Sequence, residues 1–510
     1  MKRAVAMPPQ EVELKLALLT SDPQALAARI ARLPVLARRK STRQTLHNIY
    51  FDTPERALQS KRVALRLRRV GTPARPHWLQ TFKTGGRSDS ALHQRGEWEV
   101  ALPGQALSIE ALQGTAWAEI DPDGSVFNAL QPVFHTSFER TTWLVRRRDR
   151  SVIEVALDIG VVAAGDARAP LCELELELKE GGPLALFELA GQIAGEISTL
   201  PGAMSKSERG YALAAGRLNQ PQPANAPALR GKISVRGAAG PILREMFGHF
   251  TSNLQALMVS DDAEVAHQVR VGWRRFRSAL RLFDGAIGAD AVPPRQALEP
   301  LLEFLGELRD LDVAREETLP ALAERFAAGN GLRSQAWTAM MQTLEDAATT
   351  RRKSVRYALQ SPAVGVYLLA IIQWLEALAS PLRLDEEKRR PAPILRDWAE
   401  HRVDHLCKKL KKAQKNARTE TDLHRVRIMA KRVRYNIEAL RDVLLKQATQ
   451  RRYQHAKELQ TRLGATRDVL QAAGLVAALD ADSGLQEYLR GYATGSTRPN
   501  ESERHLPLID

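Results

Sequence analysis

Two different spacings of hydrophobic residues divide this chain of 510 residues. From Glu11 to about Glu180, hydrophobic and polar residues repeatedly alternate, which is the period of a β-strand with one buried face. From about Ile242 onward, hydrophobic residues recur at helical spacing with few glycines between them. Between these halves, Gln220–Pro227 is rich in proline and small polar residues and predicts an extended linker. The length also exceeds that of a usual single domain, so two domains of different class are predicted.

Five segments of the first half place charged side chains on one face and hydrophobic side chains on the other. They are Glu11–Leu16, Ala64–Arg68, Glu97–Val100, Glu154–Ile159 and Glu173–Leu178. The usual interpretation is an antiparallel sheet whose charged face meets water. Here, however, like charges follow one another along each strand, which is unfavourable unless opposite charge lies nearby. The alternative is a barrel with its charged face inward, covered outside by helices predicted at 23–33 and 183–197.

The helical half contains an internal repeat. His267–Arg277 aligns position by position with His424–Arg434, and Leu305–Asp310 aligns with Leu463–Asp468 at nearly the same offset. Two matched blocks in the same order indicate a duplicated helical unit.

Each copy carries a line of cations at steps of three and four residues, which places them on one helical face. These cation lines are His267, Arg270, Arg274 and Arg277 in the first copy and His424, Arg427, Lys431 and Arg434 in the second. A solvated basic face is the usual interpretation of such a run. Like charges at this spacing destabilise a helix, and the line occurs twice, which favours binding of a long polyanion. Nucleic acid is disfavoured, because the lines lack the amide and aromatic side chains that read or stack bases.

Composition points to the same kind of partner. Lysine and arginine number 74 against 59 acidic residues, a formal net charge of +15. Cys172 and Cys407 lie far apart and offer neither a disulfide framework nor a cysteine zinc site, as expected in a reducing compartment. The first residues lack a signal-peptide hydrophobic stretch, and the longest apolar run, Val364–Ile372, is too short for a bilayer. We therefore expect a cytoplasmic protein without membrane-spanning segments.

An inward charged face would present carboxylates on one wall and arginines and lysines on the other. Hard divalent ions such as Mg²⁺ and Mn²⁺ bind carboxylate oxygens, and guanidinium groups bind phosphate oxygens. Such a lumen suits a metal-bound polyphosphate. The sequence lacks the G-x-S-x-G, H-E-x-x-H and G-x-x-x-x-G-K-[ST] motifs, so hydrolysis is expected to use metal-assisted attack by water.

The order of motifs in the first half resembles the CYTH domain, the triphosphate tunnel metalloenzyme superfamily. The motifs are Glu11-x-Glu13-x-Lys15, Tyr50–Pro54, Leu65–Arg68 and Cys172–Lys179. The resemblance spans roughly residues 8–217 and implies a closed eight-stranded antiparallel β tunnel that hydrolyses triphosphates with Mg²⁺ or Mn²⁺. It implies catalytic roles for Glu11, Glu13 and Lys15.

The same resemblance implies a metal side and a phosphate side. The metal-binding carboxylates would be Glu11, Glu13, Asp158, Glu175 and Glu177, with Glu173 as an alternative to Glu177 on the same face. The phosphate-binding cations would be Lys15, Arg66, Arg68, Lys83, Arg140 and Lys206. Lys206 matches the family's terminal lysine, although a second lysine usual in this part of the family is absent here.

The paired H-x-x-R-[VI]-x-x-[RK]-R-x-R and Leu-Gly-x-x-Arg-Asp blocks resemble the CHAD domain. This is a histidine-containing helical domain often found after CYTH domains and associated with inorganic polyphosphate. The resemblance spans about residues 240–490 and implies two four-helix units around a basic channel, with both cation lines binding long-chain polyphosphate. The second unit departs from the first at Leu470, where the first has Asp312.

Together these patterns predict an α+β two-domain chain, with an N-terminal eight-stranded antiparallel β tunnel and flanking helices, and a C-terminal all-α domain of two duplicated four-helix units. The predicted bounds are 1–218 for the tunnel domain, 219–232 for the linker, 233–490 for the helical domain with repeats at 240–384 and 394–490, and 491–510 for a flexible tail.

The predicted activity is that of an inorganic triphosphatase, which converts inorganic triphosphate to diphosphate and phosphate in the cytoplasm and at polyphosphate granules. The predicted partners are inorganic triphosphate and long-chain polyphosphate, with no membrane partner and no particular oligomeric state. The alternatives are a thiamine or nucleoside triphosphatase, an adenylyl cyclase with the same tunnel, or a polyphosphate-binding scaffold without catalysis.

Overall fold

The computed structural model describes residues 10–20, 22–72, 74–86, 91–202, 204–225, 229, 233–287, 292–378, 395–444, 446–479 and 482–497. Several predictions lie outside this range: those on residues 1–9, on 226–228 and 230–232 of the linker, on the boundary between the two helical repeats at 384–394, and on the tail beyond 497. The chain divides into two compact units. Residues 1–220 and 360–374 form the barrel unit, and residues 221–359 and 375–510 form the helical unit.

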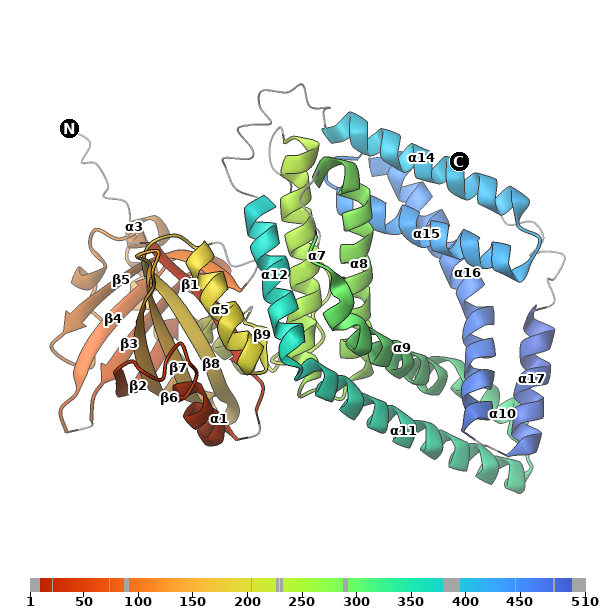
Figure 1. Ribbon diagram of the computed structural model, residues 1–510, viewed down its shortest axis with the longest axis horizontal. Coiled ribbons are helices and arrows are strands. Elements are labelled where there is room, and N and C mark those ends of the chain that lie inside the picture. The colour runs from red at the N-terminus through yellow and green to blue at the C-terminus, as the bar shows by residue number, and fades with distance from the viewer. Residues whose placement is uncertain are drawn as a thin grey trace. The chain divides into compact units, whose positions relative to one another are not determined.

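A closed antiparallel barrel is the framework of the barrel unit (Figure 1). Eight strands pair in the order β5-β4-β3-β2-β6-β7-β8-β1, and β1 also pairs with β5 to close the ring, which confirms the predicted eight-stranded tunnel. A short strand, β9, pairs with the end of β1. The strands are β1 (Gln10–Leu18), β2 (Ser41–Asp52), β3 (Ala64–Val70), β4 (His77–Lys83), β5 (Leu92–Leu102), β6 (Gln131–Arg146), β7 (Val152–Ala164), β8 (Ala167–Glu180) and β9 (Thr199–Pro201).

Helices cover the apolar outer face of the barrel, as predicted. α1 (Pro23–Ala31) begins at Asp22, whose carboxylate accepts hydrogen bonds from the next two free backbone N–H groups. α5 (Leu184–Glu196) packs against β1 and β8 through buried side chains that include Leu189 and Ile193. The short helices are α2 (Ala57–Ser60), α3 (Trp117–Ile120) and α4 (Ser125–Asn128). A cluster of buried hydrophobic residues beneath α2 and α3 contains Leu58, Val63, Leu65, Phe82, Leu112, Trp117 and Ile120.

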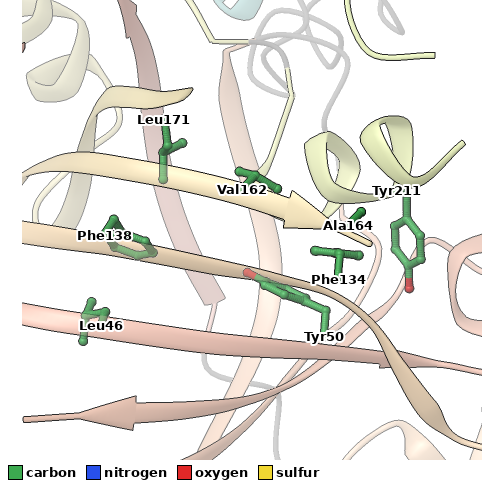
Figure 2. Packing of buried hydrophobic residues seen from close by; sticks show 8 residues of the cluster. All are labelled: Leu46, Tyr50, Phe134, Phe138, Val162, Ala164, Leu171 and Tyr211. Atoms are coloured by element: carbon green, nitrogen blue, oxygen red, sulfur yellow. The ribbon is translucent and has the colours of Figure 1, made fainter. Parts of the chain in front are cut away.

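The lumen is charged over one part and apolar over another. Tyr50 of β2 lies opposite Arg66 of β3 and Phe134 of β6. Side chains alternate between the two faces of a strand, so these three residues and every second residue from them on their strands face the lumen. Tyr211, from α6 (Lys206–Ala214), packs its ring edge-on against Phe134 with 5.1 Å between ring centres. Figure 2 shows this apolar plug, which consists of Leu46, Tyr50, Phe134, Phe138, Val162, Ala164, Leu171 and Tyr211. Side chains therefore fill this part of the lumen, and the charged cavity occupies the rest.

The contact between α6 and the apolar plug depends on a glycine. A Cβ atom on Gly210 would lie 2.1 Å from two ring carbons of Phe134, well inside van der Waals contact. We expect Gly210→Ala to lower the free energy of unfolding by about 2 kcal/mol, because the ring is enclosed and cannot move aside. Urea unfolding followed by tryptophan fluorescence measures this change. Gly191→Ala in α5, where nothing lies within 4 Å, is the control and should be neutral or slightly stabilising.

The helical unit contains two copies of four long helices (Figure 1). The first copy is α7 (Val235–Leu257), α8 (Ala263–Ile287), α9 (Glu299–Val313) and α11 (Gly331–Leu359), with the short α10 (Ala323–Ala327) before α11. The second is α14 (Leu395–Asn416), α15 (Glu420–Leu440), α16 (Lys446–Ala478) and α17 (Ser483–Thr497). The matched blocks fall on α8 and α15 and on α9 and α16, and these equivalent helices pack against each other. The predicted all-α duplicated domain is therefore confirmed.

The start of the predicted linker is hydrogen-bonded to this unit. Asn253 accepts a hydrogen bond from the backbone N–H of Gln222 at 2.9 Å and donates one to its carbonyl at 3.1 Å. Arg275, which is buried, donates to the carbonyl of Asn225 at 3.0 Å. These residues are therefore held against α7 and α8.

One helix groups differently from the prediction. Residues 360–374, placed by the sequence in the first helical repeat, belong to the barrel unit and form most of α12 (Pro362–Leu378). A Cβ atom on Gly365 would lie 2.7 Å from the carbonyl oxygen of Thr199 in β9, so the two backbones approach closely. Helical periodicity shows that a helix has a buried face, but not which surface covers it.

The last helix also ends later than predicted. α17 continues past Gly491, where the sequence predicted a flexible tail. Leu489 is buried, and the ring centre of Tyr488 lies 5.2 Å from that of Phe326. This packing stabilises the final turns despite their polar composition.

No single described helix is both long and apolar enough to cross a membrane. The consecutive helices α11 and α12 reach that length and apolarity only as a pair, and they are bent by 64° relative to each other.

Candidate active site

The charged part of the lumen encloses a cavity of about 250 Å³. Ionisable side chains at alternate positions of the strands form most of its wall, so the charged faces point inward, as the barrel interpretation predicted. Ten predicted site residues line it: Glu11, Glu13, Lys15, Arg66, Arg68, Lys83, Arg140, Glu175, Glu177 and Lys206. Asp158 is fully buried and bonded to Arg140, which lies opposite it in the register. The structure thus brings together all the residues predicted for the tunnel site.

The pairing register explains why like charges can follow one another along a strand. Residues directly opposite in an antiparallel pair are closer together than alternate residues of one strand. Opposite charges occupy such positions in four pairs: Lys15–Glu175, Arg140–Asp158, Glu11–Arg95 and Lys83–Glu97. The wall therefore neutralises much of its own charge.

Glu11 and Glu13 of β1 are each held by two cations. Glu11 accepts hydrogen bonds from Lys83 Nζ and Arg95 Nε, both at 2.9 Å. Glu13, which is 2% exposed, accepts from Lys15 Nζ at 3.0 Å and Arg95 Nη2 at 2.5 Å. Burial alone would raise the pKa of both carboxyl groups, but the neighbouring cations lower it instead. Both side chains are therefore carboxylates at neutral pH.

A carboxylate trio lies on β7 and β8. Oxygens of Asp158, Glu173 and Glu175 lie within 4.8 Å of one another. Lys206 Nζ lies 2.6, 2.6 and 2.9 Å from these three carboxylates in that order. Burial would lower the pKa of Lys206, but the carboxylates raise it, so the side chain stays an ammonium. Arg140 donates to Asp158 at 2.7 and 2.6 Å and also to Glu175.

Local sequence fixes the helix that carries this lysine. Lys206 is the first residue of α6, which begins with a capping box of the Ser-x-x-Glu type. Ser205 Oγ accepts from the N–H of Glu208 at 3.2 Å, and the Glu208 carboxylate accepts from the N–H of Ser205 at 2.7 Å. Further along, Tyr211 donates its hydroxyl to Asp52 at 2.8 Å. The helix that supplies Lys206 is therefore held at its first turn and again at Tyr211.

Glu177 lies apart from the carboxylate trio. It sits opposite Glu13 in the register, and Lys179 Nζ lies 2.6 Å from its carboxylate. Partial burial raises the pKa of Glu177, the reverse of the direction for Glu13. The structure thus groups Glu173, the alternative in the sequence prediction, with Asp158, and leaves Glu177 beside β1.

The cations of β3 form the other wall. Arg66 Nη2 lies 3.5 Å from Glu97, and its Nη1 donates to the Tyr50 hydroxyl at 3.5 Å. Arg68 Nε donates to the side-chain oxygen of Asn48 at 2.8 Å. Burial and the neighbouring Arg66 lower the pKa of Arg68 to about 10, which leaves it charged at neutral pH. An anion in the cavity would therefore be stabilised by the positive charges of two buried guanidinium groups, those of Arg66 and Arg68.

The sequence prediction assigns no role to several side chains of the cavity. They are Tyr50, Arg95, Glu97, Glu99, Glu154 and Lys179. Glu97 and Glu99 are visible in the sequence as alternating anions. Arg95 lies two positions before Glu97, so extending the alternation by one step would place it on the same face.

The ligand set of the tunnel fits a hard divalent cation. Glu11, Glu13 and Glu177 offer carboxylate oxygens on β1 and β8, and the carboxylate trio offers a second group. Carboxylate oxygens are the ligands that Mg²⁺ and Mn²⁺ prefer.

The two cation lines of the helical unit meet where α8 and α15 pack. Burial and four arginines lower the pKa of Lys431 to about 7, and Arg427 contributes most among them. Arg274 of the first copy has the next largest effect on this pKa, so cations of both copies are neighbours. Arg467 Nη1 lies 3.1 Å from His424 Nδ1. We call Arg274, Arg427, Lys431 and Arg467 the interhelical cluster, and Asp468 is an acidic neighbour of its last three members.

The first arginine of each cation line lies beside the glycine of the duplicated Leu-Gly motif. A Cβ atom on Gly306 would lie 3.0 Å from Arg270 Nη1, and one on Gly464 would lie 3.6 Å from Arg427 Nη2. Each guanidinium therefore lies against the backbone of the following helix in its own copy.

The last arginine of each line lies in a different environment. Burial lowers the pKa of Arg277, and the positive charge of Arg295 lowers it further. Arg434 Nε lies 3.3 Å from Glu438 and its guanidinium stacks on Tyr435 at 4.8 Å. Arg434 is therefore already paired with a carboxylate of its own helix.

Two domain families match the chain. The CYTH domain profile matches residues 9–211, and the CHAD domain profile matches residues 241–477. Among curated proteins, an inorganic triphosphatase from Haemophilus influenzae is 34% identical over 205 residues, which is 40% of this chain and 55% of that protein. The chain thus spans about half the length of this relative.

Solved structures resemble each part. The CHAD domain from the plant Ricinus communis is 27% identical, covers 56% of this chain and 96% of its own, and has a TM-score of 0.48. A putative adenylyl cyclase from Hippeastrum, described as having a dominant triphosphatase activity, is 18% identical, covers 41% of this chain and 97% of its own, and has a TM-score of 0.30.

Proposed function

We propose that this chain, in which a CYTH domain is followed by a CHAD domain, hydrolyses inorganic triphosphate to diphosphate and phosphate with Mg²⁺ or Mn²⁺. The observation that carries the proposal is the closed lumen, where buried carboxylates and cations surround a cavity of about 250 Å³. The inorganic triphosphatase that is 34% identical to this half supports the choice of substrate.

The phosphate chain would be bound by the cations predicted from the sequence. These are Lys15, Arg66, Arg68, Lys83, Arg140 and Lys206. Their partners in the free tunnel are carboxylates, so an incoming phosphate chain replaces one anion with another. As the bond between the terminal phosphorus and its bridging oxygen breaks, charge grows on the diphosphate, and fixed cations stabilise that charge.

The divalent ion would be held by Glu11, Glu13, Asp158, Glu175 and Glu177, with Glu173 able to replace Glu177. When bound, such an ion neutralises phosphate charge and makes a water molecule easier to deprotonate. Burial would lower the pKa of Lys15, but Glu13 and Glu175 raise it. Lys15 therefore acts as a fixed positive charge rather than as a proton acceptor.

Phosphate release by the full chain tests the proposed reaction. Tripolyphosphate, long-chain polyphosphate, ATP and thiamine triphosphate are each assayed with Mg²⁺, Mn²⁺, Ca²⁺ or a chelator. We expect tripolyphosphate to be the best substrate and the chelator to abolish release. Faster release from ATP or thiamine triphosphate would favour those substrates, and no release from any of them would contradict an enzyme.

We also propose that the helical unit binds long-chain inorganic polyphosphate. The support is the duplicated line of cations and the interhelical cluster, in which positive charge from both copies is concentrated. The two cation lines lack the amide and aromatic side chains with which proteins read or stack nucleic-acid bases.

Lys431 gives this binding a specific pH dependence. Its pKa of about 7 means that it loses charge as the pH rises through 7, whereas a bound polyanion favours the charged form. Affinity for polyphosphate should therefore fall between pH 6.5 and 8.5. Lys431→Arg, which restores the residue type found at Arg274 in the first copy, stays charged and should remove most of this fall.

Fluorescence anisotropy with labelled polyphosphate at constant ionic strength measures how the affinity depends on pH. Lys409→Arg on the exposed face of α14 is the control and should leave it unchanged. Burial and neighbouring arginines also lower the pKa of His267 and His424 below the usual imidazole value, so these two contribute only at lower pH. An unchanged profile in Lys431→Arg would contradict this origin of the pH dependence.

A further inference from the structure

The ammonium group of Lys206 occupies the centre of the carboxylate trio. Its Nζ lies within 2.9 Å of an oxygen of Asp158, Glu173 and Glu175, and Asp158 is fully buried. Lys206 itself is 6% exposed. Three carboxylate oxygens converging on one point at such distances form a cation site, and here the cation is part of the chain.

The other cations around the trio do not share this position. Arg140 binds Asp158 and Glu175 from one side through its planar guanidinium, and Lys15 bridges Glu13 and Glu175. Only Lys206 contacts all three carboxylates among the described residues. A divalent ion bound by all three carboxylates would therefore take the position of the Lys206 ammonium, at short range and with little water to screen the repulsion.

The anchoring of α6 allows this lysine to move without its helix. Tyr211 is bonded to Asp52, and Gly210 lies against Phe134, so the backbone of α6 is fixed. The side chain of Lys206, by contrast, is a flexible four-carbon stem at the first position of the helix. Phosphate oxygens in the neighbouring cavity offer its ammonium an alternative anion, since Lys206 also lines that cavity.

We propose that Lys206 is the resident counter-cation of the carboxylate trio, and that triphosphate admits a divalent ion to the trio by drawing the ammonium onto its own oxygens. Triphosphate and metal then bind synergistically, and each raises the affinity of the other by the same factor. This inference rests on the proposed function and adds a role for Lys206 as a gate for the metal, beyond binding phosphate.

Metal binding to the full chain without any phosphate compound tests the role directly. Mn²⁺ binding is measured by electron paramagnetic resonance of the free ion in wild type, Lys206→Met and Lys179→Met. Lys179 contacts Glu177 at the same cavity, so its loss changes the net charge equally and frees a carboxylate outside the trio, which tests whether the gain is specific to the trio. We expect Lys206→Met to bind Mn²⁺ at least about tenfold more tightly than both other proteins, because the buried trio then has one cation fewer and its centre is open to the ion.

Lys206→Gln, which keeps an N–H donor but no charge, provides a second variant and should show the same gain if Lys206→Met does not fold. Equal Mn²⁺ affinity in wild type and both Lys206 variants, or an equal gain in Lys179→Met, would overturn the inference. These outcomes are separate from the proposed function, because wild type can still release phosphate from tripolyphosphate in either case. If wild type releases no phosphate from tripolyphosphate, the proposed function is wrong, but the comparison of Mn²⁺ affinities still tests the role of Lys206.

Discussion

Replacing Glu13 with glutamine is expected to reduce metal-dependent phosphate release from tripolyphosphate by about 10³-fold, a loss typical of removing one key electrostatic group. Glu13 is buried and accepts hydrogen bonds from Lys15 and Arg95. Glutamine has nearly the same shape but cannot supply the negative charge that a divalent ion requires. It also leaves the two buried cations without a carboxylate between them.

The matched control is Glu139→Gln. Glu139 is the neighbour of Arg140 on β6, but it faces outward and is about half exposed. Turnover by the Glu139→Gln protein should stay within about threefold of wild type, since Glu139 touches neither substrate nor metal in the proposed reaction. Near-normal turnover by a folded Glu13→Gln protein would contradict the role assigned to this carboxylate.

Charge reversal at Arg270 and Arg427 together is expected to weaken binding of long-chain polyphosphate by at least about 10²-fold at moderate salt. Both guanidinium groups belong to the duplicated cation lines and lie beside Gly306 and Gly464. A polyanion that contacts several cations releases counterions, a relation established for nucleic acids and applied here to another polyanion. The variant should therefore also show a shallower dependence of affinity on salt concentration.

The control reverses two other arginines of α15, Arg425 and Arg432, which are exposed and outside the cation line. It alters the net charge by the same amount, so any effect of overall charge appears in both proteins. Double-stranded DNA at matched phosphate concentration is titrated in parallel. Unaltered polyphosphate binding in Arg270→Glu with Arg427→Glu, or equal or tighter binding of DNA by wild type, would show that this face serves another ligand.

The alternation of charged and hydrophobic residues was a sound guide to the barrel. It correctly divided β1, β3, β5, β7 and β8 into an outer face beneath helices and an inner face, because the direction of a side chain depends only on its position in the strand. It could not show that part of the inner face is apolar. Phe134 and Phe138 have the same parity as Arg140, and only the closure of the barrel reveals that they meet Leu171 and Tyr211.

The helical half shows the same division. The repeat and the cation lines were visible in the sequence, since helical spacing places residues on one face regardless of context. The sequence did not show that α12 belongs with the barrel, nor that α17 continues past Gly491. Both depend on surfaces supplied by residues far away in the chain, such as Thr199 and Phe326.

The sequence by itself determined the two fold classes, which residues share each charged face and the chemical types of the groups in the tunnel. The tertiary structure decided which of those groups are neighbours. It placed Glu173 rather than Glu177 beside Asp158, set Lys206 among three carboxylates, and added Arg95 to the wall. The physical reason is that alternation and helical spacing are local properties of one segment. Contact between side chains depends on strand order, register and helix packing, which join residues distant in the sequence.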